Sequence, residues 1–226
     1  MNELTRRRFV GATAGAATGL AATTLTTLGP AAPASAAPAS RTWAGHRSAN
    51  GWEILAAAQE HGIEGSGRTV RLAGGDAATI LLHVARRYHY EIQQLRESDV
   101  RGHRTDRRVR EPYESNHLSG TALVIRPAAY PLGVSGGLYP RELTVVRDIL
   151  AELDGVVAWG GDFTVPKESH FEIAYAPGHP KVKGVARKVD GWNTGPGNEG
   201  AGATDAFDPG RRTRAEAFAR SHRARS

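Results

Sequence analysis

The sequence predicts a small α+β domain in which helices flank an antiparallel sheet. It contains two segments with the apolar spacing of amphipathic helices and four short strand-like runs. These elements lack the regular strand–helix–strand alternation that accompanies a parallel sheet. The globular pattern extends from residue 50 to 190, and a length of about 140 residues is typical of a single domain.

Both predicted helices carry apolar residues at spacings of three and four. The first is expected over residues 77–96, with Asp76 as its N-cap and an apolar face made of Leu81, Val84, Tyr88, Ile92 and Leu95. The second is expected over residues 141–153, and its apolar face comprises Leu143, Val146, Ile149, Leu150 and Leu153. Pro140 stands just before the second helix, and Asp154-Gly155 should end it.

Four short runs are predicted to be strands: 69–72, 121–125, 156–159 and 171–175. In the last run, Phe171, Ile173 and Tyr175 alternate with Glu172 and Ala174. This alternation predicts a strand that is buried on one face, with Glu172 pointing to solvent.

The N-terminal 36 residues predict a bacterial twin-arginine export signal. Adjacent arginines at Arg6-Arg7 precede an apolar run over residues 10–28, and Ala34-Ser35-Ala36 forms a small-residue cleavage pattern. The run is too weakly hydrophobic for a stable membrane span, which takes about 20 strongly apolar residues. We expect cleavage after Ala36 and a secreted or cell-wall-associated domain, with an uncleaved anchor as the alternative.

The segments around the domain are expected to lack fixed structure. Residues 37–49 are a spacer rich in Pro, Ala and Ser. Residues 191–226 are rich in Gly and Arg and show no apolar periodicity, which predicts a disordered tail.

Composition restricts both the metal chemistry and the partners. The chain has no cysteine, so a metal site must use His, Asp and Glu. The net charge is +6, and removal of the signal with its three arginines and one glutamate leaves +4. A mildly basic exported protein suits an anionic surface such as a cell wall, and no aromatic stacking motif points to nucleic acid. The basic run 101–110 is interpreted as a solvated loop.

Two histidines form the centre of the candidate site. Imidazole is the commonest zinc ligand in proteins, and a hydrolytic zinc site takes three protein ligands and a water. His117 and His170 supply two ligands. Val124 stands where an acidic third ligand would be sought, and its side chain cannot bind a metal.

Five short motifs, in this order, resemble the VanY-type zinc D-alanyl-D-alanine carboxypeptidases and L-alanyl-D-glutamate endopeptidases. The resemblance extends from residue 50 to about 189 and rests on Asn50-Gly51-Trp52, Ser115–Ala122 (SNHLSGTA), Pro131-Leu132-Gly133, Trp159–Asp162 and His170-Phe171-Glu172. It implies a small domain of the DD-peptidase and hedgehog type, a zinc cofactor in a cleft beside the sheet, and peptidoglycan stem peptides as substrates. We expect a monomer.

The family pattern Ser-x-His-x-x-Gly-x-Ala-x-Asp is matched in part. Ser115, His117, Gly120 and Ala122 agree with it, whereas the zinc-binding aspartate is replaced by Val124. The last zinc ligand of the family falls on His170. The general base, an acid three residues earlier in the family, is replaced by Lys167, and Glu168 is the nearest carboxylate.

These changes leave the roles of several residues open. Glu168 could act as a displaced base, and Asp162 or Glu172 could complete the metal shell. Asp162 could instead fix the turn of residues 159–162. Arg108 or Arg110 could hold a substrate carboxylate, as the resemblance implies, or remain solvated.

Ser115 is expected near the substrate by resemblance, although a serine at such a turn often bonds to backbone. Two functions therefore remain. One is a wall peptidase whose zinc is bound weakly, and the other is a degenerate domain without zinc that binds wall peptides or a protein partner without cleaving them.

Overall fold

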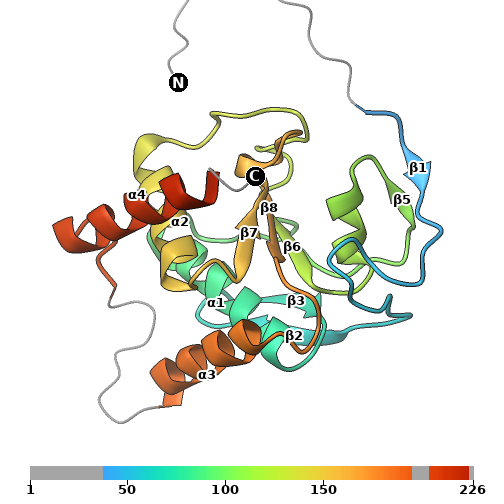
Figure 1. Ribbon diagram of the computed structural model, residues 1–226, viewed down its shortest axis with the longest axis horizontal. Helices are drawn as coiled ribbons and strands as arrows, with labels where there is room; N and C mark the ends of the chain where they lie inside the picture. The colour runs from blue at the N-terminus through green and yellow to red at the C-terminus, as the bar shows by residue number, and fades with distance from the viewer. Residues whose placement is uncertain (1–37, 195–203, 224–226) are drawn as a thin grey trace, which may run out of the picture. The chain divides into compact units, whose positions relative to one another are not determined.

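A computed structural model describes residues 38–194 and 204–223, which belong to one compact unit of the chain (Figure 1). The export signal predicted for residues 1–36 lies outside the described residues.

The central sheet has four antiparallel strands. Their order is β4 (Val100–Arg101), β6 (Ala122–Ile125), β8 (His170–Ile173) and β7 (Val157–Trp159). Two strand pairs lie beside it: β2 (Gln59–Ile63) with β3 (Arg68–Leu72), and β1 (Arg41–Thr42) with β5 (Arg108–Val109). The predicted α+β class is confirmed.

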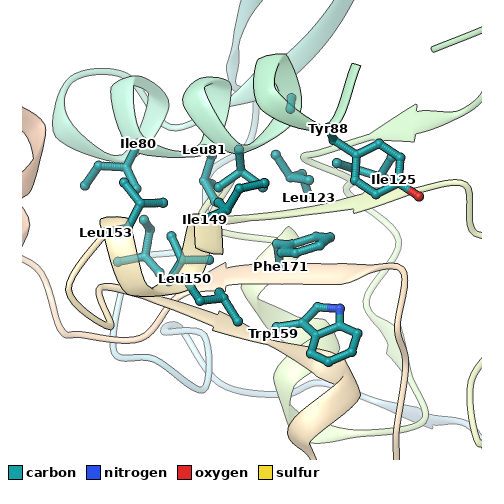
Figure 2. Packing of buried hydrophobic residues seen from close by; sticks show 14 of the residues in the cluster. Ile80, Leu81, Tyr88, Leu123, Ile125, Ile149, Leu150, Leu153, Trp159 and Phe171 are labelled. Atoms are coloured by element: carbon teal, nitrogen blue, oxygen red, sulfur yellow. The ribbon is translucent and has the colours of Figure 1, made fainter. Parts of the chain in front are cut away.

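One face of this sheet packs against helices α1 (Asp76–Glu91) and α2 (Pro140–Glu152). Leu123, Phe171 and Trp159 are directly paired across β6, β8 and β7, so their side chains share that face. Figure 2 shows Leu123 and Phe171 pointing toward the apolar residues of the two helices. The opposite face carries His170 and is covered by the 3-10 helix η1 (Pro112–His117). A second 3-10 helix, η2 (Gly160–Asp162), follows β7.

The predicted helices agree with α1 and α2, with two differences at the ends of α1. The prediction of Asp76 as the N-cap is wrong, because Gly75 occupies that position and Asp76 is the first residue of the helix. Helix α2 begins at Pro140 and is ended by Asp154 and Gly155, which have φ angles of 50° and 74°. Helix α1 stops at Glu91, five residues before the predicted end at 96. The main chain turns there, because the amides of Ile92 and Gln93 both donate to the Tyr88 carbonyl.

The prediction of a spacer over residues 37–49 is wrong for the part that the structure describes. Arg41 and Thr42 form β1 on β5, and the amide of Ala49 donates to Ser115 Oγ at 2.8 Å. These contacts join residues more than sixty positions apart, and composition alone does not reveal them.

The prediction of a disordered tail is also wrong for the described residues. Helix α3 (Pro180–Thr194) continues past residue 190 and packs on α1, and helix α4 (Pro209–Arg223) packs on α2 (Figure 1). The guanidinium of Arg211 holds α4 in place by hydrogen bonds to Asp148 and Glu152. Residues 195–203 and 224–226 of the predicted tail lie outside the described part.

A buried ionic network joins the helices. Arg87 on α1 is fully buried and forms ion pairs with Glu91, Asp148 and Glu152. Arg211 contacts two of these carboxylates, so the network extends from α1 through α2 to α4. Among the residues that the structure describes, no helix combines the length and apolarity required to cross a membrane.

Candidate functional site

The two predicted ligand histidines lie side by side. His117 is the last residue of η1, His170 is the first of β8, and their ring centroids are 5.2 Å apart in an edge-on arrangement. The turn after His117 depends on Gly120, whose φ of 68° favours glycine and whose Cα lies against the Ala73 amide. A side chain at position 120 would meet that backbone, so this turn requires glycine.

Each imidazole is oriented through one ring nitrogen. His117 Nδ1 donates to the Gly102 carbonyl at 2.9 Å, and His170 Nε2 donates to Glu172 Oε2 at 2.7 Å. The other nitrogens, His117 Nε2 and His170 Nδ1, therefore carry lone pairs. His170 Nδ1 is buried and has no hydrogen-bond partner among the described residues. Orientation by an outer acceptor is typical of metal-binding histidines, so these two donors fit zinc.

The third ligand position is apolar. Val124 on β6 is directly paired with His170, and Arg101 on β4 is directly paired with Val124. Paired residues of antiparallel strands share a face, so Arg101, Val124 and His170 form a row across the sheet. Within the described ranges, no group of three His, Asp or Glu side chains is placed to hold a metal ion. The residues thus fit a two-imidazole site and not the three-ligand site of a zinc hydrolase.

Glu172 is buried, and the prediction that it points to solvent is wrong. Its Oε2 accepts hydrogen bonds from both His170 Nε2 and Asn116 Nδ2, the latter at 2.6 Å. The outer face of β8 is covered by η1, which brings Asn116 over the strand. Sequence reasoning missed Asn116 and the orienting role of Glu172. The spacing of two residues between His170 and Glu172 was the available signal, since it places both on one face of a strand.

Lys167 reaches the groove beside His117 and forms an ion pair there. Its ammonium donates to Glu114 Oε1 at 2.6 Å, and Glu114 Oε2 accepts from the Arg110 amide at 2.8 Å. Burial raises the pKa of Glu114, but the charge of Lys167 outweighs it, so this pKa lies below its ordinary value. Burial holds the pKa of His117 well below 6.5, and the electrostatic influence of the neighbouring His170 and Lys167 side chains lowers it further. The surroundings of His117 therefore disfavour added positive charge.

Glu168, the candidate displaced base, binds a loop. Its two carboxylate oxygens accept hydrogen bonds from the amides of Gly136 and Gly137, at 2.7 and 2.9 Å, and the residue is buried. The carboxylate of Glu168 thus lies against the loop that follows Pro131-Leu132-Gly133, and it forms no hydrogen bond or ion pair with either histidine.

The other candidate residues have clear partners. Both Asp162 oxygens accept from the Arg147 guanidinium, which stacks 4.8 Å from the Trp159 ring centroid, so Asp162 fixes the turn to α2. Ser115 Oγ donates to the Pro112 carbonyl at 2.7 Å, in addition to accepting from the amide of Ala49. These two side chains are parts of the scaffold.

A groove of about 820 Å³ opens beside His117, Val124 and Lys167. Its lining includes six cationic side chains and two acidic ones: Arg71, Arg101, Arg104, Arg108, Arg110, Lys167, Glu60 and Glu114. Most of the basic run 101–110 lines this groove. The interpretation of the run as a solvated loop holds only in part, because Arg101 belongs to β4, Arg108 and Val109 form β5, and about half of the run is exposed. The histidine pair is thus bordered by excess positive charge.

Comparisons of the chain with protein-family models, with curated protein sequences and with solved structures give no significant match.

Proposed function

We propose that this protein is an exported peptidase-like domain that binds anionic ends of peptidoglycan stem peptides and has no efficient hydrolytic centre. The observation that carries the proposal is the row Arg101–Val124–His170, in which the apolar side chain of Val124 stands opposite His170, where a zinc hydrolase needs an acid, and the cation of Arg101 stands on the other side of Val124. The resemblance of the motifs to wall peptidases supports the choice of ligand.

The charges around the histidine pair favour an anion over a divalent cation. Lys167, at the position of the general base, is a cation, and Arg104 contributes further positive charge near His117. Without a carboxylate ligand the positive charge of zinc is not neutralised, and loss of a general base costs about 10²–10⁴ in rate. A peptide carboxylate in the groove would instead form charge-assisted hydrogen bonds with these cationic side chains.

A second function, weak zinc-dependent peptidase activity, is favoured by one observation. The lone pairs of His117 Nε2 and His170 Nδ1 are free, and the ring orientations are fixed by Gly102 and Glu172. Bound zinc would supply an activated water and polarise a carbonyl. His117 and His170 would hold it.

Titration calorimetry with a synthetic stem peptide in the presence of a chelator tests the proposal. A peptide with a free C-terminal carboxylate should bind at least about tenfold more tightly than the same peptide with a C-terminal amide. The amide lacks the negative charge that would pair with the cations of the groove. Lys167→Gln should remove most of this preference. Lys183→Gln, an exposed lysine on α3, is the matched control and should keep it. Equal binding of acid and amide would refute the proposal. Zinc-dependent cleavage of the same peptide, in a parallel assay with added zinc and no chelator, would favour the second function.

Export is part of the same proposal and has its own test. Replacement of Arg6 and Arg7 by Lys should block secretion through the twin-arginine route. Unchanged secretion of this variant, or a mature protein that retains Met1, would contradict it.

A further inference from the structure

Three guanidinium groups on the groove have no partner within the part of the chain that the structure describes. The side chains of Arg101, Arg108 and Arg110 are exposed, line the groove, and form no hydrogen bond or ion pair there. Other arginines of the same fold, such as Arg87 and Arg147, are fully engaged by carboxylates. The groove therefore presents free donors, in contrast to the paired arginines of the helices.

Two of these arginines lie on separate short strands, and Arg110 follows the second strand directly. Arg101 ends β4, Arg108 begins β5, and Arg71, which also lines the groove, lies on β3. The amide of His103 donates to the Arg71 carbonyl at 2.7 Å, which joins β3 to the segment after β4. β5 is paired with β1. The arginines thus line the groove from several anchored segments of backbone, and this array of charges extends beyond the immediate surroundings of the histidine pair.

The size of the charge excess indicates a ligand with several anionic groups. The groove carries six lysine or arginine side chains against Glu60 and Glu114. One peptide carboxylate can pair with one or two guanidinium groups and would leave the others uncompensated. A phosphodiester unit keeps its negative charge throughout the physiological pH range, and its two free oxygens match the planar guanidinium fork.

We propose that this groove binds a linear polyol-phosphate polymer, a chain of phosphodiester units without bases, with Arg101, Arg108 and Arg110 as its principal contacts. Among the described residues, the groove lining contains no Phe, Trp or Tyr on which nucleic-acid bases would stack. Such a polymer places one anion per repeat and can lie along an open groove. Recognition of this kind requires neither a stem peptide nor a metal ion. The proposal can therefore be tested independently of the function proposed above.

Fluorescence anisotropy with a labelled oligo(glycerol phosphate) of about ten repeats tests the proposal on the folded, mature protein. The oligomer should bind at least tenfold more tightly than glycerol phosphate alone. Its affinity should fall with salt, because each paired phosphate releases counterions, with a log–log slope near −2 for three contacts on the scale of flexible single strands.

The variants separate a specific array from net charge. The triple variant Arg101→Gln, Arg108→Gln, Arg110→Gln should lose at least tenfold in affinity and most of the salt slope. A control with Arg68, Lys183 and Arg187 each changed to Gln removes the same charge from exposed positions outside the groove and should stay within about twofold.

Four results would overturn the proposal: equal losses in the two triple variants, no dependence on oligomer length, equally tight binding of a poly-glutamate of the same charge, or tighter binding of a single-stranded DNA with the same number of phosphates. Unchanged thermal midpoints of both triple variants establish that the arginines act through binding. Because stem peptides are absent from the assay, its failure would leave the peptide-binding proposal to its own test.

Discussion

Val124→Asp places a carboxylate opposite His170, and its effect on stability can be worked out from the structure. Val124 is 6% exposed, so the change removes apolar burial worth about 1.5–3 kcal/mol and buries a polar group at a further cost of about 1–3 kcal/mol. Arg101, directly paired with this position, would offset part of that cost. Without metal, we expect the free energy of unfolding to fall by about 2–4 kcal/mol.

Zinc should reverse most of this loss. The new carboxylate would join His117 and His170 as a third ligand, and its contribution to zinc affinity should exceed the roughly 10–100-fold of an outer-shell partner. Zinc at about 100 times its dissociation constant adds about 2.7 kcal/mol to the free energy of unfolding. The wild-type chain, with two imidazole donors, should gain much less at the same zinc concentration.

Urea unfolding with and without zinc measures both effects. Val124→Asn introduces a side chain of the same size as aspartate but without its charge. This variant should be destabilised, and zinc should not restore its stability. Addition of His117→Ala to Val124→Asp should abolish the rescue, and addition of Lys167→Asp should create slow cleavage of a stem peptide. The reasoning would be refuted by a Val124→Asp protein that zinc does not stabilise, or by rescue that persists without His117.

Three further changes test other parts of the structure. Arg211→Ala removes the hydrogen bonds that hold α4 on α2, and urea unfolding should show a loss of about 1–3 kcal/mol; an unchanged value would mean that α4 does not dock in solution. Burial raises the pKa of Glu152, but the hydrogen bond from His83 and neighbouring cations hold it well below 4.5, so its stabilisation is present above pH 4.5 and is lost as the pH falls below that value. Glu152→Gln should therefore flatten the acid side of the stability–pH curve, and an equally steep curve would contradict this assignment. Glu172→Gln in the Val124→Asp protein should weaken zinc binding by about 10–100-fold in calorimetry, and unaltered affinity would show that the carboxylate does not orient the imidazole.

Local patterns predicted the fold better than the site. The helical periodicity around Leu81 and Ile149 was sufficient to locate α1 and α2, because each helix buries an apolar face that repeats along the chain. Helix α4 has few apolar residues and is held by Arg211 through contacts with residues about sixty positions away. The sequence of α4 therefore lacks the apolar periodicity by which α1 and α2 were located.

The same distinction explains the errors at the site. The motifs predicted that His117 and His170 would meet, and the structure places their rings together. The environment of Glu172 depends on η1, which folds over the strand from more than fifty residues away. The position of Glu168 depends on the amides of a separate loop. Alternation along one strand cannot report either contact.

The zinc content and activity of the wild-type domain test the central claim most directly. After dialysis of the folded protein against micromolar zinc and then against buffer, elemental analysis should find far less than one zinc per chain, and a stem peptide should remain intact over hours. One tightly held zinc per chain, together with stem-peptide cleavage that a chelator suppresses, would contradict the account. In that case a carboxylate other than one at position 124 must complete the site beside His117 and His170.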